Sequence, residues 1–342
     1  MKKCIALILA LAMLFTMAAC ASTSDSASDT PASGTSASAP AASGTASGTL
    51  TVGTGGEGGT YYAFAGVLAT VIGQKTDLDL SVVSTGGSKD NLVSMNDGIY
   101  QLATVQSDVM TYAYNGTNSF ADSGAISSFR VLGALYAETV QMVTLNPDIK
   151  SVADLKGKNV CIGDVGSGTY YNTIDVLAAY DMTLDDITPV YQSFSDSTES
   201  LKDGKIDAAF LCAGAPTTAV TELATANDLY LISIDDAHME KLLADCPYYA
   251  SYTIPAGTYN GFDEDAQTVT VKATLVASNS VSDDAAYAIV QAIFDNAEEI
   301  SGLHAKGAEL SLEFATDGIA VPFAAGAARY YAENGITVTT AD

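Results

Sequence analysis

Two short glycine-led segments with paired tyrosines are the residues of this sequence best suited to holding a small anion. GGTYY occupies positions 58 to 62 and SGTYY occupies positions 167 to 171. Glycine lets the backbone approach a ligand closely, threonine adds a hydroxyl group, and tyrosine supplies an aromatic wall with a polar tip. One such segment alone is typical of a turn whose tyrosines pack in a core. Two segments at equivalent positions favour a binding site.

The pattern around these segments predicts two α/β units. Apolar β-branched runs alternate with helical runs, which indicates a parallel sheet wrapped by helices in each unit. The expected strands lie at 50–53, 78–84, 102–105, 159–163, 189–192 and 207–212, and the expected helices at 61–74, 90–96, 108–114, 170–180 and 198–203. Long extended stretches at 129–145 and 268–277 flank the second unit, so the chain is expected to cross between two domains twice. Helices near 283–299 and 322–333 would then complete the first domain.

Each glycine-led segment follows the first strand of its unit and begins the first helix. Ligands of open α/β sheets bind beyond the carboxyl ends of the strands, where helix N-termini present free N–H groups and partial positive charge. Further residues share this location: Thr85, Gly86, Ser88 and Gln106 in the first unit, and Phe194, Gly214, Ala215 and Pro216 in the second. We therefore expect these residues to line one cleft between the two domains, together with Gly58, Gly59, Thr60, Tyr61, Tyr62, Ser167, Gly168 and Thr169.

Catalytic and cofactor motifs are weak in this sequence. The glycines from 53 to 58 match G-x-G-x-x-G, but the next strand ends in Ser84 and Thr85, where a dinucleotide site needs an acid. Ser167 misses the nucleophile elbow because Val165 stands where glycine is required. We expect no catalytic residue, no metal and no cofactor.

The first 48 residues predict export and a tether. Lys2 and Lys3 precede a short apolar run, and the segment ends with small residues before Cys20, which resembles a bacterial lipobox. Residues 1–19 would be a signal peptide, and Cys20 would carry the lipid unless the signal is an ordinary one. From 21 to 48, 24 of 28 residues are Ala, Ser, Thr or Gly, which predicts a flexible linker with a reach of roughly 30 Å.

The charge of the chain excludes polyanionic partners. The formal net charge is −26 over 342 residues, and such an acidic body repels phosphate backbones and anionic membrane surfaces. We expect no nucleic-acid partner and a link to the membrane through the lipid anchor alone.

Several stretches together resemble the TAXI group of extracytoplasmic solute receptors, which serve TRAP transporters. The stretches are GTGGEGGTYYAFAGVLA (53–69), STGGSKDNL (84–92), LATVQSDVMTYAYNG (102–116), IKSVADLKGKNVCIGDVGSGT (149–169), LKDGKIDAAFLCAGAPT (201–217), PYYASYTIPAGTY (247–259), VKATLVAS (271–278) and PFAAGAARYY (322–331). They cover nearly all of residues 50–335.

This resemblance implies an α/β, two-lobed type II periplasmic-binding-protein fold with a cleft between two domains. Lobe I would comprise 49–138 and 253–342, and lobe II 139–252. It adds Ala213 to the ligand-contacting loops and implies a monomer that binds a small carboxylate, such as glutamate, glutamine or a C4–C5 dicarboxylate. The partner would be a TRAP membrane permease. A secreted enzyme or a ligand sensor on the same scaffold is the alternative.

Two matters remain open at this stage. Glu57 occupies a loop position that often holds an uncharged residue in the TAXI group, so its carboxylate would either face solvent or meet a ligand ammonium group. Cys161, Cys212 and Cys246 are expected as buried thiols, with a Cys161–Cys212 or Cys212–Cys246 disulfide as the alternative.

Overall fold

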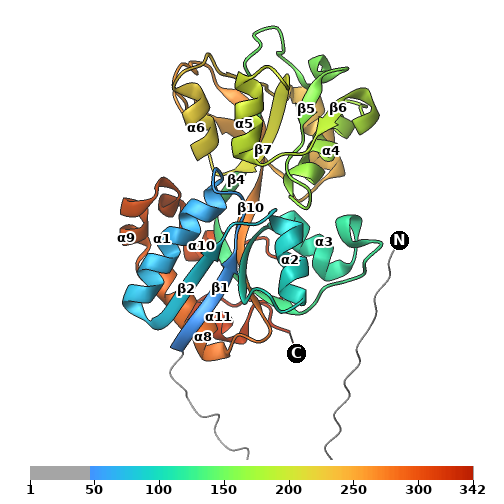
Figure 1. The fold of residues 1–342 in the computed structure, drawn as a ribbon. Helices are drawn as coiled ribbons and strands as arrows, with labels where there is room; N and C mark the ends of the chain where they lie inside the picture. Colours follow the sequence, from blue (N-terminus) through green and yellow to red (C-terminus); the bar gives the residue numbers. More distant parts are fainter. Residues whose placement is uncertain (1–46, 342) are drawn as a thin grey trace, which may run out of the picture. The chain divides into compact units, whose positions relative to one another are not determined.

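The computed structural model describes residues 47–341 of the chain, shown in Figure 1. The predicted signal peptide at 1–19, the predicted lipidation site at Cys20 and most of the predicted linker lie outside the described residues. The linker was expected to run to Gly48, but β1 already begins at Ser47. Ser47 and Gly48 lie opposite Asp77 and Leu78 of β2 in a parallel ladder, and this pairing extends the strand beyond the apolar run that predicted it.

One sheet runs through the whole described region. Its order is β2-β1-β3-β10-β4-β7-β5-β6, with β8 added to β4 and β9 added to β10. The strands are β1 (Ser47–Gly53), β2 (Asp77–Val83), β3 (Leu102–Gln106), β4 (Phe129–Thr144), β5 (Asn159–Cys161), β6 (Thr188–Val190), β7 (Ala208–Ala213), β8 (Tyr230–Leu231), β9 (Ala250–Ile254) and β10 (Ala266–Ser278).

Two parallel groups of strands are joined by two long antiparallel strands. β1 pairs in parallel with β2 and β3, and β5 pairs in parallel with β6 and β7. β4 and β10 pair with each other in antiparallel fashion, and each also borders one parallel group. The two extended stretches predicted from the sequence are therefore confirmed as β4 and β10, which pass from one lobe to the other (Figure 1).

Helices cover the sheet on both lobes. They are α1 (Thr60–Lys75), α2 (Ser88–Asn96), α3 (Ser107–Asn115), α4 (Thr169–Ala179), α5 (Phe194–Lys202), α6 (Thr218–Ala224), α7 (Asp236–Asp245), α8 (Asp283–Phe294), α9 (Ala297–Leu303), α10 (Leu312–Thr316) and α11 (Ala325–Glu333). None of the helices among residues 47–341 is both long and apolar enough to cross a membrane.

Two expected helices differ from those in the structure. The helix expected over 283–299 is two helices, α8 and α9, since the chain leaves the helical path at Asp295 and Asn296. The helix expected from residue 322 begins at Ala325, because the backbone before it is bonded to β4. Val131 N–H donates to the Pro322 carbonyl, and Ala324 N–H donates to the Val131 carbonyl.

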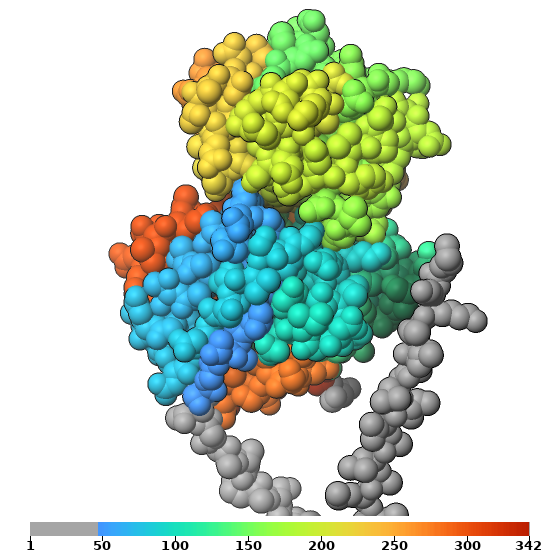
Figure 2. All heavy atoms as spheres, viewed as in Figure 1, coloured from blue at the N-terminus to red at the C-terminus, as the bar shows by residue number. Residues whose placement is uncertain are grey.

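The apolar cores separate the two lobes, which form two distinct bodies in the space-filling view (Figure 2). One core draws its buried residues from 52–136 and 273–331. Two further cores draw theirs from 140–271 and include Ile254, Phe262 and Val269. Residues 254–271, expected in lobe I, thus pack with lobe II. We propose that the second crossing lies within β10, near residue 272, rather than at residue 253.

Candidate functional site

The carboxyl ends of the inner strands and the starts of four helices surround a small cavity between the lobes. α1 and α2 reach it from lobe I, and α4 and α5 reach it from lobe II. The cavity has a volume of about 50 Å³. One water molecule needs roughly 10–15 Å³ by this measure, so the cavity as it stands has room for only a few water-sized groups.

Most of the residues predicted from the sequence line this cavity. They are Gly59, Thr60, Tyr61, Thr85, Gly86, Ser88, Gln106, Ser167, Gly168, Thr169, Phe194 and Ala213. The two glycine-led segments therefore face the same space from opposite lobes, as their equivalent positions predict.

Five predicted residues do not line the cavity: Gly58, Tyr62, Gly214, Ala215 and Pro216. Two of them contribute to contacts between the lobes instead. The Gly58 carbonyl accepts a hydrogen bond from Ala219 N–H at 3.1 Å. The Gly214 carbonyl accepts one from Thr60 Oγ1 at 3.0 Å. Tyr62 and Ala215 are half-buried and Pro216 is exposed.

Sequence reasoning missed six residues that line the cavity: Gly55, Gly56, Glu138, Asp164, Ser193 and Cys212. Gly87 also lines it and lies inside the predicted loop from Thr85 to Ser88. Five of the six lie within a few residues of a predicted position, so a wider reading of the same loops would have found them. Glu138 lies in the middle of β4, far from any strand end. Its signal was a carboxylate that directly follows the apolar run from Val131 to Ala137.

Three helices begin at the cavity with glycine as the N-cap residue, and in α4 Ser167 Oγ accepts from Tyr170 N–H of the first turn. Gly59, Gly87 and Gly168 are the N-cap residues of α1, α2 and α4, and none of them has a side chain to accept the first N–H groups. By contrast, α5 has a Ser193 side chain that accepts from Asp196 N–H. An uncapped helix start leaves donors and positive potential available to an anion.

Direct hydrogen bonds connect the two lobes around the cavity. The Gly166 carbonyl of lobe II accepts from Lys89 N–H at 3.0 Å and from Asp90 N–H at 3.3 Å, both at the start of α2. Thr60 Oγ1 uses its proton in the bond to Gly214. This threonine therefore connects the lobes in this structure rather than pointing a donor at a ligand.

A buried polar network lies between α3 and α4 beside the cavity. Gln106 Nε2 donates to Asn172 Oδ1 at 3.1 Å, and Asn172 Nδ2 donates to Asp108 Oδ2 at 3.3 Å. Asp108 Oδ1 and Gln106 Oε1 are buried and have no hydrogen-bond partner among the described residues. Burial raises the pKa of Asp108 from 3.8 to about 7, since a desolvated carboxylate is disfavoured.

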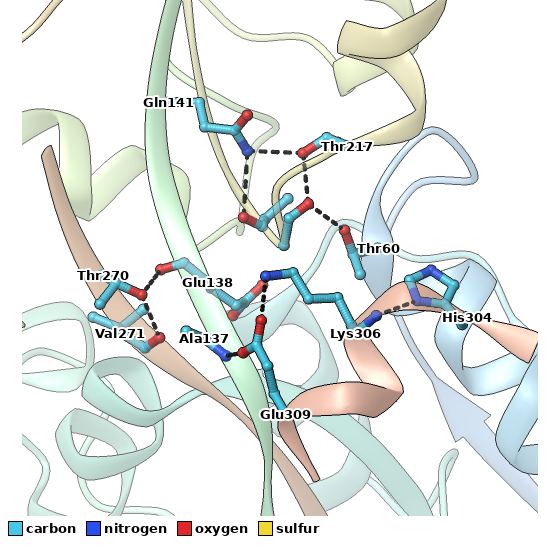
Figure 3. A network of polar contacts seen from close by, with 12 residues as sticks. Thr60, Ala137, Glu138, Gln141, Thr217, Thr270, Val271, His304, Lys306 and Glu309 are labelled. Carbon is cyan, nitrogen blue, oxygen red and sulfur yellow. Dashed lines mark hydrogen bonds and ion pairs between the residues drawn. The ribbon is translucent and has the colours of Figure 1, made fainter. Parts of the chain in front are cut away.

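Glu138 is a buried acid among the residues that line the cavity, and Figure 3 shows it near Lys306 and Glu309. Its side chain is 1 % exposed, and Tyr61 Oη donates to its Oε2 at 2.5 Å. Burial raises the pKa of Glu138 well above its usual range. The Tyr61 hydrogen bond and the charge of Lys306 oppose that increase. Burial and the neighbouring Glu138 also raise the pKa of Tyr61.

The two arginines and Glu57 lie away from the cavity. Arg130 donates to backbone carbonyls beside it, and Arg329 pairs with Asp284. Glu57 is exposed and does not line the cavity, so of its two expected orientations the structure shows the one facing solvent.

Thiols and metal sites do not add chemistry to the site. Cys161, Cys212 and Cys246 are free thiols, not disulfide partners. Among residues 47–341, no cluster of three or more His, Cys, Asp and Glu side chains is arranged to hold a metal ion.

Comparison with protein families matches residues 52–335 to the model of the NMT1-like family. The chain belongs to the NMT1-like family. This NMT1-like protein also resembles solved structures from several bacteria, at sequence identities that show the fold alone.

Three of these structures illustrate the likeness. A protein from Bordetella bronchiseptica RB50 is 18% identical with a TM-score of 0.51, over 83% of this chain and 88% of that chain. The alkanesulfonate-binding protein SsuA from Xanthomonas axonopodis pv. citri, bound to MOPS, is 18% identical with a TM-score of 0.48, over 84% of each chain. The GluR0 ligand-binding core from Nostoc punctiforme, in complex with L-glutamate, is 16% identical with a TM-score of 0.46, over 75% of this chain and 98% of that chain. The NMT1-like protein has the two-lobed type II periplasmic-binding-protein fold.

Proposed function

We propose that this protein is the extracytoplasmic solute-binding receptor of a TRAP-type secondary transporter. It captures a small carboxylate such as glutamate, glutamine or a C4–C5 dicarboxylate between its lobes and delivers it to the membrane permease. The observation that carries this proposal is the small cavity at the lobe boundary, lined from both sides by the two glycine-led segments.

The chemistry of the cavity supports an anionic group on the ligand. No lysine or arginine is among the residues that line it within the described chain. The glycine-capped starts of α1 and α4 supply N–H donors and partial positive charge instead, whereas Lys89 and Asp90 N–H at the start of α2 already donate to the Gly166 carbonyl. Together they suit a carboxylate, with the site residues acting mainly through their backbones.

The positions of the two histidines and the state of Cys212 favour binding over catalysis. His304 packs edge-to-face against Phe64, and His238 lies at the surface beside Asp235. Neither histidine is near Ser167 or Cys212 as a base would have to be. Burial raises the pKa of the Cys212 thiol, which works against a reactive thiolate.

Anchoring and partner choice complete the proposal. Lipidation at Cys20 would hold a monomeric receptor at the outer face of the cell membrane, with the Ala/Ser/Thr/Gly-rich linker as its tether. A neighbouring gene for a multi-span TRAP permease would support the transporter class. A neighbouring ABC-type ATPase gene would contradict it.

A thermal-shift screen of the purified full chain tests the ligand class. We expect at least one amino acid or dicarboxylate of three to five carbons to raise the melting temperature. A ligand at ~100 times its dissociation constant stabilises by about 2.7 kcal/mol. Neutral sugars and amides of similar size are the control set. Stabilisation by the control set alone would overturn a carboxylate receptor.

A further inference from the structure

Glu138 presents an unused hydrogen-bond acceptor to the cavity. Tyr61 donates to its Oε2, no group of residues 47–341 donates to Oε1, and Oε1 is not one of the fully enclosed unpaired oxygens of these residues. The side chain is almost fully buried and lines the cavity. An unpaired oxygen of a buried acid costs free energy unless a donor reaches it. The donor that completes this site must therefore come from the ligand.

The nearest cation is already paired with a different acid (Figure 3). Lys306 Nζ lies 2.6 Å from Glu309 Oε1, and Glu309 Oε2 accepts from Ala137 N–H at 2.7 Å. Lys306 is 4 % exposed, so its ammonium group is largely desolvated, whereas the Glu309 side chain is 34 % exposed. Lys306 acts on Glu138 through the Coulomb interaction of their charges and not through a hydrogen bond. The lysine thus compensates Glu309 and leaves Glu138 without a matching positive charge.

Two other acids add negative charge in or near the cavity. Asp164 lines the cavity from lobe II. Asp108 lies close enough that its charge also acts on Glu138. A dianionic ligand would bring further negative charge against this wall, and like charges a few ångströms apart disfavour one another. A ligand that carries one positive group beside its carboxylate would balance the site.

We infer that Glu138 binds the ammonium group of an α-amino acid, while the ligand carboxylate lies at the glycine-capped starts of α1 and α4. This inference rests on the proposed function and narrows its substrate class from small carboxylates to amino acids. Tyr61 is a positioning residue, since its hydroxyl holds Oε2 and leaves Oε1 free for the ligand. Glu57, the other acid considered for this role, is exposed and takes no part.

Matched ligand pairs test the inference on the unmodified protein. Calorimetry on the purified full chain compares L-glutamate with 2-oxoglutarate, L-alanine with pyruvate, and L-leucine with 4-methyl-2-oxopentanoate. The members of each pair differ in the ammonium group, which the oxo acid replaces with a carbonyl. We expect the amino acid of any pair that binds to do so at least ~30-fold more tightly, the low end for a buried hydrogen-bonded charge pair.

Two variants locate the source of this preference. Glu138→Gln keeps the shape of the side chain and an acceptor for Tyr61 but removes the negative charge. It should weaken binding of the amino acid by the same factor, so that the amino acid and the oxo acid of a pair bind with similar affinity. Glu57→Gln makes the same chemical change on an exposed residue three positions before the start of α1. It should leave both affinities within threefold of the original values.

The outcomes separate the inference from the proposed function. Oxo acids that bind as tightly as their amino acids would overturn the inference and leave a carboxylate receptor standing. The same holds if Glu138→Gln keeps the amino-acid preference. If Glu138→Gln does not fold, the ligand pairs on the unmodified protein decide alone. If no member of any pair binds, the carboxylate receptor fails and the inference fails with it.

Discussion

Gly168 lies at a close approach of the two lobes. A Cβ atom built on it would overlap the side-chain carboxamide of Gln106, which comes from the other lobe and is buried. The backbone of Gly168 is right-handed helical, so alanine fits its conformation. The obstacle to a side chain here is therefore the opposite lobe and not the local backbone.

Gly168→Ala should weaken ligand binding by about tenfold or more and leave the melting temperature of the unliganded protein within ~2 °C. The added methyl group keeps the lobes apart, and overpacking typically costs about 1–3 kcal/mol. Calorimetry and thermal melts measure the two effects. Gly66→Ala in α1, where a Cβ meets nothing within 4 Å, is the matched control and should bind normally. Equal affinity in both variants would contradict this account of the lobe contact.

Among the individual residues of the site, the sequence predicted those in the loops better than it predicted Glu138 in β4. Thr60 and Gly168 could be placed because glycine-led turns at strand ends have a known relation to ligands in α/β sheets. Glu138 could not, since its neighbours in space, Tyr61 and Lys306, are far away in sequence. Only the folded chain shows that Lys306 is paired with Glu309 rather than with Glu138.

Among the elements, α3 and α4 meet through a buried acid. Asp108 at the start of α3 is 1 % exposed and accepts from Asn172 of α4. Burial raises its pKa to about 7. A group whose pKa is raised in the folded, closed form stabilises that form fully below its unfolded pKa, near 3.8. This contribution is lost as the pH rises through about 7.

The melting temperature should therefore be higher at pH 5.5 than at pH 8. The difference should be about 2–4 °C for each kcal/mol of unfolding free energy lost between these two pH values, in a protein of this size. Asp108→Asn should reduce this difference, because the amide cannot ionise. Some dependence should persist, since the pKa of Glu138 is also raised. Asp317→Asn, an exposed carboxylate on the distant α10 loop, is a suitable control. An unchanged pH difference in Asp108→Asn would exclude Asp108 as its source.

Element types were predictable, whereas several boundaries were not. The alternation of β-branched and helical runs indicated the parallel strand groups, and the two long extended stretches indicated the crossings. The split between α8 and α9 escaped prediction because Asp295 and Asn296 carry no glycine or proline signal. The packing of residues 254–271 with lobe II depends on contacts of Tyr259 and Phe262 that local pattern does not encode.

For the whole molecule, the proposed function requires the lobes to separate and approach. A ligand that contacts both lobes stabilises the closed arrangement by its preference for it over the open one. Small-angle scattering of the full chain should show a smaller radius of gyration with a saturating ligand than without it. Gly168→Ala should show a reduced change under the same conditions. Identical profiles with and without a confirmed ligand would argue against binding between the lobes.

The pairing of β4 with β10 determines where such a motion bends the chain. Its register shifts twice, between Ala273 and Thr274 and again between Leu275 and Val276, while β4 continues as one strand. A bulge disrupts the ladder locally and bends the strand, so we predict that these shifts act as a hinge on the lobe I side of the crossing. Glu138 lies opposite Val271, just beyond the first shift. A group close to a hinge axis travels little, so Glu138 could hold the same end of a ligand in the open and closed forms while the lobe II loops swing onto the other end.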